Sequence, residues 1–204
     1  MPLAIAVCVS GRGSNLAALL DRLDALGDAA PAAVRLVLSN RADAGALDLA
    51  RARGVATAVL ADPADAEAWL APLRAHGIGL VVLAGFLKLV PPAVVAAYRD
   101  RMLNIHPALL PAFGGPGMYG LRVHRAVLEA GVRESGATVH LVSEEYDRGE
   151  ILGQARVPVE PGDTPEALAA RVLAVEHRLL PAAVLAAARA GHPVPFTLSG
   201  ESPA

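Results

Sequence analysis

The sequence predicts an α/β fold, doubly wound, with a mostly parallel central sheet flanked by helices and an antiparallel strand addition in the C-terminal half. Three observations predict it. Over the first half of the chain, short apolar runs alternate with Ala-rich amphipathic stretches, which is typical of right-handed βαβ units. The apolar runs are continuous, as expected of strands that are covered on both faces. In the second half, two extended segments are separated only by an acidic turn, which favours an antiparallel pair.

The first half contains four expected strands and three expected helices. The strands are the runs rich in Val, Leu and Ala: Leu3–Val9, Ala33–Leu38, Val55–Val59 and Leu80–Ala84. The helices are the amphipathic stretches between them: Asn15–Leu26, Ala44–Arg53 and Ala64–His76. Polar residues in front of these helices are expected to cap them: Ser14, Asp43, and either Asp62 or Asp65. The second and third helices are expected to end at Gly54 and Gly77.

The pattern changes after Gly85. We expect a helix from Pro91-Pro92 to about Tyr98, a short strand Met102–Ile105, and a Gly-rich loop, residues 108–120, that acts as a mobile lid. The remaining elements are expected to be a helix, two antiparallel strands and a long helix interrupted by Pro181: Val123–Ala130, Ala137–Ser143, Ile151–Val159 and Pro165–Ala190. No change of composition suggests a second domain, so residues 1–192 are expected to form one domain and residues 193–204 a loosely ordered tail.

Length and composition exclude several classes of protein. With 204 residues, of which 54% are hydrophobic, the chain can bury a sizeable core and is not disordered. The net charge of −2 argues against a nucleic-acid partner. No apolar run reaches the roughly 18–20 residues of a membrane span, and no signal peptide is evident, so we expect a cytoplasmic protein without a membrane partner. The single cysteine, Cys8, is expected to be buried, and zinc-ligand spacings are missing, so no metal is expected.

The first candidate binding site is the segment Ser10-Gly11-Arg12-Gly13-Ser14-Asn15, between the first expected strand and helix. Glycines let the backbone approach a ligand, and a helix N-terminus presents unpaired N–H groups to an anion. Leu16 stands where a dinucleotide fingerprint needs its third glycine, and the Gly-Lys-Ser/Thr of a Walker motif is absent. The segment therefore favours a phosphate monoester, with an ordinary strand-to-helix turn as the alternative.

The second candidate site combines Asn104 and His106, which lie on the same side of an extended segment at the end of a strand. An amide donor and an imidazole together could hold a developing oxyanion; the alternative is a histidine whose ring is satisfied by a carbonyl. The acidic turn Glu144–Glu150 matters only if the fold brings Asp147 beside His106, where its charge would raise the imidazole pKa. We expect His140 to point toward the same end of the sheet, and His124 to be structural.

Together these motifs resemble the phosphoribosylglycinamide formyltransferase family, a branch of the folate-dependent formyl transferases. The resemblance runs from about residue 3 to about residue 190 and is carried by seven motifs: Gly11–Leu16, Ser39-Asn40-Arg41, Leu83–Leu89, Leu103–Pro111, Gly136–His140, Asp147 and Glu176-His177. It implies that the formyl group of 10-formyltetrahydrofolate, the co-substrate, is transferred to the amine of glycinamide ribonucleotide in de novo purine biosynthesis. The products would be formylglycinamide ribonucleotide and tetrahydrofolate.

The resemblance also implies roles for individual residues. The expected catalytic residues are Asn104, His106 and Asp147. Residues expected to bind glycinamide ribonucleotide are Gly13, Ser14, Asn15 and Glu176. Residues expected to bind the folate are Leu87, Lys88, Leu89, Val90, Asn104, Ser143, Glu144, Glu145, Tyr146 and Asp147. The phosphate-binding half would span about residues 1–100, and the folate and catalytic half about residues 101–192. No metal is implied, and a homodimer is compatible with the sequence.

Three other functions are alternatives. A formyltetrahydrofolate deformylase usually has an additional N-terminal domain and a second histidine where Pro107 stands. A methionyl-tRNA formyltransferase would need a C-terminal barrel and a basic surface. A non-catalytic phosphate-binding module would use only the Gly-rich turn and would leave the three expected catalytic residues apart. The chain also departs from the resembling family at Pro116, where we expect Lys, and at Ala66-Glu67, where many members carry a basic residue; both positions concern the folate tail.

Overall fold

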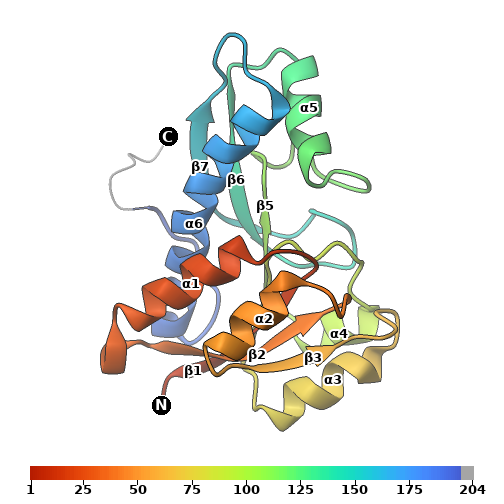
Figure 1. The fold of residues 1–204 in the computed structure, drawn as a ribbon, viewed down its shortest axis with the longest axis vertical. Coiled ribbons are helices and arrows are strands. Elements are labelled where there is room, and N and C mark those ends of the chain that lie inside the picture. Colours follow the sequence, from red (N-terminus) through yellow and green to blue (C-terminus); the bar gives the residue numbers. More distant parts are fainter. Residues whose placement is uncertain (199–204) are drawn as a thin grey trace.

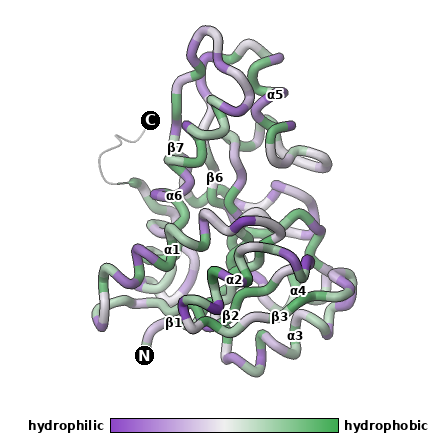
Figure 2. Tube along the Cα trace, in the orientation of Figure 1, coloured by the Kyte–Doolittle hydropathy of each residue, from purple (hydrophilic) through white to green (hydrophobic). Residues whose placement is uncertain are grey.

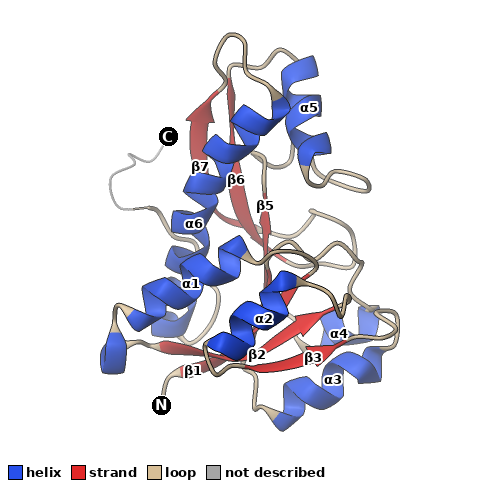
Figure 3. Cartoon of the chain, in the orientation of Figure 1, coloured by secondary structure: helices blue, strands red, loops and turns tan. Residues whose placement is uncertain are grey.

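The computed structural model describes residues 1–198 and contains a seven-stranded sheet flanked by helices (Figures 1 and 3). The strands are β1 (Leu3–Val9), β2 (Ala32–Ser39), β3 (Ala56–Val59), β4 (Leu80–Leu83), β5 (Met102–His106), β6 (Glu134–Leu141) and β7 (Ile151–Pro158). The helices are α1 (Ser14–Asp24), α2 (Gly45–Ala52), α3 (Ala66–Ala75), α4 (Pro92–Ala97), α5 (Leu121–Glu129) and α6 (Pro165–Ala190), with a short 3₁₀ turn at Gly27–Ala29. The predicted fold class is confirmed, and the predicted element ends lie within a few residues of those observed.

The strand order is β3-β2-β1-β4-β5-β6-β7. All pairs from β3 to β5 are parallel, whereas β5 with β6 and β6 with β7 are antiparallel. The parallel part arises because each strand returns to the sheet through a helix, and the antiparallel part because β6 and β7 are joined by a turn. Strand β5 therefore belongs to both parts of the sheet.

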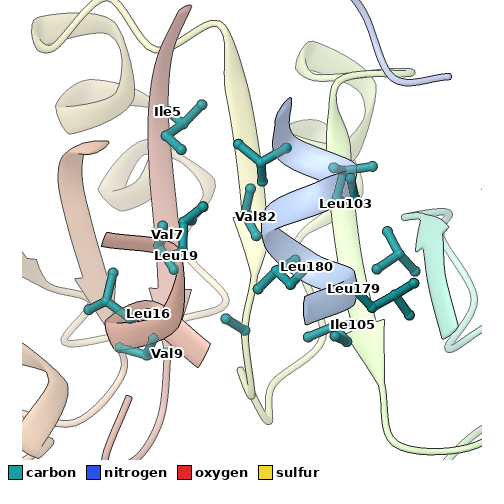
Figure 4. Packing of buried hydrophobic residues seen from close by; sticks show 14 of the residues in the cluster. Ile5, Val7, Val9, Leu16, Leu19, Val82, Leu103, Ile105, Leu179 and Leu180 are labelled. Carbon is teal, nitrogen blue, oxygen red and sulfur yellow. The ribbon is translucent and has the colours of Figure 1, made fainter. Parts of the chain in front are cut away.

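The core consists of two hydrophobic clusters, one on each face of the sheet. Along β1, Ile5, Val7 and Val9 enter the cluster that includes residues of α1, α2, α5 and α6 (Figure 4). The intervening Ala6 and Cys8 enter the second cluster, which packs on α3 and α4. The continuous apolar run of the sequence is thus explained by burial on both faces, and the prediction that Cys8 is buried is confirmed. Hydrophobic and hydrophilic residues alternate along helices such as α1 in Figure 2, as expected of helices with one face on the core.

The second cluster contains the only tryptophan of the chain, Trp69 on α3. Its side chain is fully buried, and its ring meets that of Phe86 edge-on with 5.0 Å between the ring centroids. The indole N–H donates a hydrogen bond to the carbonyl oxygen of Pro63 at 3.1 Å, which satisfies the polar atom of this large side chain.

Two of the predicted helix caps are wrong. Gly13, with a φ of 83°, occupies the cap position of α1, so Ser14 is the first helical residue and its side chain caps nothing. Asp43 forms an ion pair with Arg41 instead of capping α2. For the third helix, Asp65 accepts a hydrogen bond from the Glu67 N–H, as predicted. A cap depends on where the backbone turns, and the left-handed conformation at Gly13 moves that point by one residue.

Pro181 does not interrupt the last helix, because α6 runs through it from Pro165 to Ala190. The segment that follows is also better ordered than expected. The Phe196 N–H donates to the Leu152 carbonyl at 2.9 Å, and Leu198 is buried in the first cluster. The predicted loose tail therefore does not begin at residue 193, and residues 199–204 lie outside the described part of the chain. None of the helices within residues 1–198 is both long enough and apolar enough to cross a membrane.

The pairing of β6 with β7 leaves no room for a side chain at Gly136. A Cβ atom added there would lie 2.0 Å from the carbonyl oxygen of Ala155. We expect Gly136→Ala to lower the free energy of unfolding by about 1–3 kcal/mol, because the strands must shift to admit the methyl group. Urea denaturation measures this change. Gly45→Ala is the matched control, because its added methyl would lie 3.8 Å from the nearest atom; equal stability of the two variants would contradict the β6–β7 register.

Candidate active site

A cavity of about 810 Å³ opens at the carboxyl ends of β1, β4 and β5. Its walls are the turn after β1, residues 85–90 after β4, the loop 115–121, helices α5 and α6, and the turn after β6. Open α/β sheets bind ligands at this edge because the loops that follow parallel strands meet there. The cavity thus brings together sequence motifs that lie far apart along the chain.

Asn15 connects the Gly-rich turn to the last helix. Its side chain is buried, and its Nδ2 atom donates a hydrogen bond to a carboxylate oxygen of Glu176 on α6 at 2.6 Å. Burial raises the pKa of the Glu176 carboxyl above its ordinary value, and the bond from Asn15 opposes that shift. The Asn15 Oδ1 atom is buried without a hydrogen-bond partner among residues 1–198. This end of the cavity therefore offers an acceptor and a carboxyl group to a polar ligand.

Asn104 lies at the centre of a second polar group. The antiparallel register places Asn104 on β5 directly opposite His140 on β6. The Asn104 amide donates to the Nε2 atom of His140 at 3.0 Å and, in a longer bond of 3.4 Å, to the carboxylate of Asp147. His140 donates from Nδ1 to the Leu141 carbonyl at 2.7 Å, which leaves its Nε2 atom as an acceptor. The amide of Asn104 is thereby held with its NH₂ group toward Asp147.

His106 is buried beside the same carboxylate. Its Nδ1 atom lies 3.5 Å from Asp147, and its Nε2 atom donates to the carbonyl oxygen of Phe113 at 2.8 Å. Burial lowers the pKa of His106 below its ordinary value, although Asp147 and the Phe113 carbonyl act in the opposite direction. The expected effect of Asp147, which raises the His106 pKa, is confirmed in direction, but desolvation outweighs it and the net shift is downward.

Asp147 receives hydrogen bonds from several directions. Burial by itself would raise its pKa, but its contacts with His106 and the Gly115 N–H lower the pKa below the ordinary value. The Gly115 N–H donates to the carboxylate at 2.8 Å, and Gly114 lies so close that a Cβ atom there would be 3.1 Å from the Asp147 Cβ. The hydrogen bond from Gly115 to Asp147 thus connects the loop after β5 to the turn after β6. Because its pKa is lowered, the Asp147 carboxyl remains ionised.

Ser10, the first residue of the candidate segment Ser10–Asn15, has a structural role that the sequence did not predict. Its hydroxyl accepts the Leu87 N–H at 2.9 Å and donates to the side chain of Asn40 at 2.6 Å. It therefore fixes the start of the segment Leu87–Val90 that lines the cavity. Its place directly after a strand, on the ligand-binding edge, was a signal that could have identified it.

Thr138 on β6 was missed in the same way. Its buried hydroxyl donates to the Ala108 carbonyl at 2.7 Å and accepts the Leu110 N–H at 3.0 Å and the Gln154 amide at 2.9 Å. These bonds attach the start of the loop 108–120 to the sheet. Thr138 lies in the motif Gly136–His140, which was the sequence signal for this position, but its full burial and its partners are seen only in the structure.

Most of the predicted site residues line the cavity: Asn15, Leu87, Lys88, Leu89, Val90, Asn104, His106, Ser143, Glu145, Tyr146, Asp147 and Glu176. Gly13, Ser14 and Glu144 are not among the lining residues. Gly13 has a packing role, because a Cβ atom there would lie 2.6 Å from the Cβ of Ala46. His140 lines the cavity as expected. His124, predicted to be structural, lines it as well.

Comparison with known proteins identifies the family. The sequence profile described as Formyl transferase matches residues 3–184. The chain belongs to this formyl transferase family. The family resemblance of the sequence motifs is thereby confirmed.

Relatives of this formyl transferase are found in plants and bacteria. The phosphoribosylglycinamide formyltransferase, chloroplastic, of Arabidopsis thaliana is 47% identical over 188 residues, which are 86% of this chain and 62% of that protein. The phosphoribosylglycinamide formyltransferase of Escherichia coli K12 is 41% identical over 183 residues, or 87% of this chain and 83% of that protein. The chain spans only about three fifths of the length of the plant relatives, at 62% and 57%. The cytoplasmic location stays a prediction.

Solved structures agree with the fold of this formyl transferase. The phosphoribosylglycinamide formyltransferase of Anaplasma phagocytophilum superposes with a TM-score of 0.85 at 38% identity and covers 93% of this chain and 88% of that one. A formyltetrahydrofolate deformylase from Pseudomonas syringae superposes with a TM-score of 0.78 at 26% identity, and this chain covers 61% of it. The deformylase alternative thus has the same fold but lower sequence identity.

The buried, neutral state of His106 predicts a pH dependence of stability. The unfolded chain binds a proton at this histidine near its ordinary pKa of 6.5, whereas the folded chain binds it only at lower pH. Because the unfolded state holds more protons in between, the free energy of unfolding falls as the pH drops from about 7 to about 5. His106→Gln should remove that part of the slope, as measured by urea denaturation across this range. The matched control is His76→Gln, at an exposed position; a wild-type slope that His106→Gln leaves unchanged would contradict the prediction.

Proposed function

We propose that this formyl transferase moves the formyl group of 10-formyltetrahydrofolate to the amine of glycinamide ribonucleotide, giving formylglycinamide ribonucleotide and tetrahydrofolate. The observation that carries the proposal is the convergence of Asn104, His106 and Asp147 in one cavity, with 3.4 Å and 3.5 Å separating the carboxylate from the amide and the imidazole. Groups this close can act on one reacting centre, directly or through a water molecule. A non-catalytic phosphate module would not need the three residues together.

The end of the cavity near α1 suits the ribonucleotide. The N-terminus of α1 carries no side-chain cap, so its first N–H groups are available to a phosphate. Arg12, in the same turn, lines the cavity and adds a positive charge. The carboxyl of Glu176 and the unpartnered Oδ1 of Asn15 are hydrogen-bond acceptors for the sugar or glycinamide part.

The other walls of the cavity suit a flat, partly apolar co-substrate. Five large hydrophobic side chains that are exposed to solvent gather around it: Leu87, Leu89, Tyr119, Leu121 and Tyr146. Exposed apolar residues gathered around a hollow are typical of ligand-binding surfaces. These residues and the adjoining segments after β4 and β6 fit the pteridine and benzoyl rings of a folate, whose N10 carries the formyl group when bound.

Asn104 and His106 supply the hydrogen-bond donors for the reaction. As the amine attacks, negative charge develops on the formyl oxygen and needs donors that are already in place. The long bond from the Asn104 amide to Asp147 is readily exchanged for one to that oxygen. The Nε2–H of His106 donates to Phe113 in this structure, so it reaches the substrate only when the Phe113 carbonyl moves aside. Asp147 stabilises positive charge on His106 and relays the proton that the amine loses, through water, to the N10 atom that leaves with the folate.

The experiment that tests the function follows tetrahydrofolate formation by ultraviolet absorbance. With both substrates present we expect rapid turnover, whereas with the folate and water alone we expect none. Turnover without glycinamide ribonucleotide would identify a deformylase instead. No turnover in either case would contradict the proposal altogether.

Asp147→Asn tests whether the carboxylate acts in catalysis. The variant keeps the size of the side chain but removes the charge that favours protonated His106. We expect kcat to fall by about 10²–10⁴-fold, the range of lost general acid–base catalysis, with both KM values changed only a few-fold. Glu150→Gln, a loss of charge at an exposed position in the same turn region, is the control and should have no effect. A normal kcat with a greatly raised folate KM would show that Asp147 only binds the co-substrate.

A further inference from the structure

His124 is a polar side chain at an inward position of α5. It is 4% exposed, and its neighbours on the same helix face, Val123 and Val127, are fully buried. A hydrophobic residue would serve packing at this position without an unmet hydrogen bond. The Nδ1 atom of His124, however, is buried and has no partner among residues 1–198. Buried polar atoms without a partner are rare in folded proteins and call for an explanation.

The location of His124 suggests the explanation. The residue lines the same cavity as Asn104, His106 and Asp147. Helix α5 packs against α6, which carries Glu176 into that cavity. The segments proposed to hold the folate come mainly from the loops after β4 and β6, together with Tyr119 and Leu121 where α5 begins, one turn before His124. His124 therefore belongs to the part of the lining formed by α5 and α6.

The charge state of His124 suits one substrate group in particular. Burial and the nearby His106 both lower the pKa of His124, so its imidazole is neutral and has a lone pair to offer. An attacking amine must be held through its N–H bonds while its own lone pair faces the electrophile. A neutral imidazole accepts the N–H without adding negative charge.

We propose that His124 binds the attacking amine, with Nδ1 accepting one of its N–H bonds. The inference rests on the proposed function and adds to it a residue that positions the nucleophile. The amine is oriented next to His106, so that its lone pair points at the carbon to be attacked. His124 then contributes to the ribonucleotide part of the site and not to folate binding.

The test compares three substitutions in the complete chain. His124→Asn places an amide oxygen near the position of Nδ1, His124→Gln places its amide near the position of Nε2, and His124→Leu removes the polar atoms. We expect His124→Leu and His124→Gln to lose about tenfold or more in kcat/KM for glycinamide ribonucleotide, with the folate KM within about twofold. His124→Asn should recover most of that loss. Thermal melts check that each variant folds, and if the leucine variant does not, the contrast between Asn and Gln decides.

His177→Leu is the matched control. Its Nε2 atom is also buried without a partner among the described residues, but His177 lines a separate hollow and not this cavity. We expect unchanged kinetics for this variant. Equal kinetics for the Asn and Gln variants, or a leucine variant within about threefold of the wild type, would overturn the assignment while leaving the proposed function intact. A wild-type chain without ribonucleotide-dependent turnover would overturn both.

Discussion

The double pairing of β5 is the constraint on which the site depends. This strand is parallel to β4 on one side and antiparallel to β6 on the other. Because β6 runs in the opposite direction, its register sets His140 against Asn104, and the turn that follows β6 brings Asp147 to 3.5 Å from the Nδ1 atom of His106. The change from parallel to antiparallel pairing thus makes a place for Asp147 next to His106.

A single carboxylate then organises the polar groups of the cavity. Asp147 is held by the Gly115 N–H and by the Asn104 amide, and two imidazoles lie 3.5 Å away. Because little water reaches these groups, each hydrogen bond and ion contact is stronger than it would be at the surface. An unpaired polar group here would also destabilise the folded protein more than one at the surface. The same burial keeps His106 neutral until substrate charge develops. The site therefore holds one permanent negative charge, on Asp147, beside an imidazole, His106, that can become positively charged during the reaction.

Features that depend on the local sequence pattern were predicted correctly. Features that depend on how deeply a side chain is buried, or on the backbone conformation at a turn, were not. The strands from Leu3–Val9 onward were predictable because the apolar runs are too short for buried helices and alternate with longer amphipathic stretches. Asn104 and His106 were recognised from their motif, but the net pKa shift of His106 was not, because burial cannot be read from spacing. Ser14 was placed as a cap because the left-handed turn at Gly13 is invisible in composition. His124 was taken as structural, since nothing in the sequence shows that α5 turns it toward the cavity.

Because of Trp69, only one of the two hydrophobic clusters contains a tryptophan whose fluorescence can be followed. It is the only tryptophan, and it lies in the cluster under α3 and α4, on the face of the sheet opposite α1 and α6. Fluorescence excited at its absorption band therefore reports the polarity around one cluster only. Loosening of the α1–α6 face would leave the emission wavelength unchanged, while far-ultraviolet circular dichroism would register the loss of helix. Coincidence of the two signals during denaturation is thus a direct measure of how tightly the two faces are coupled.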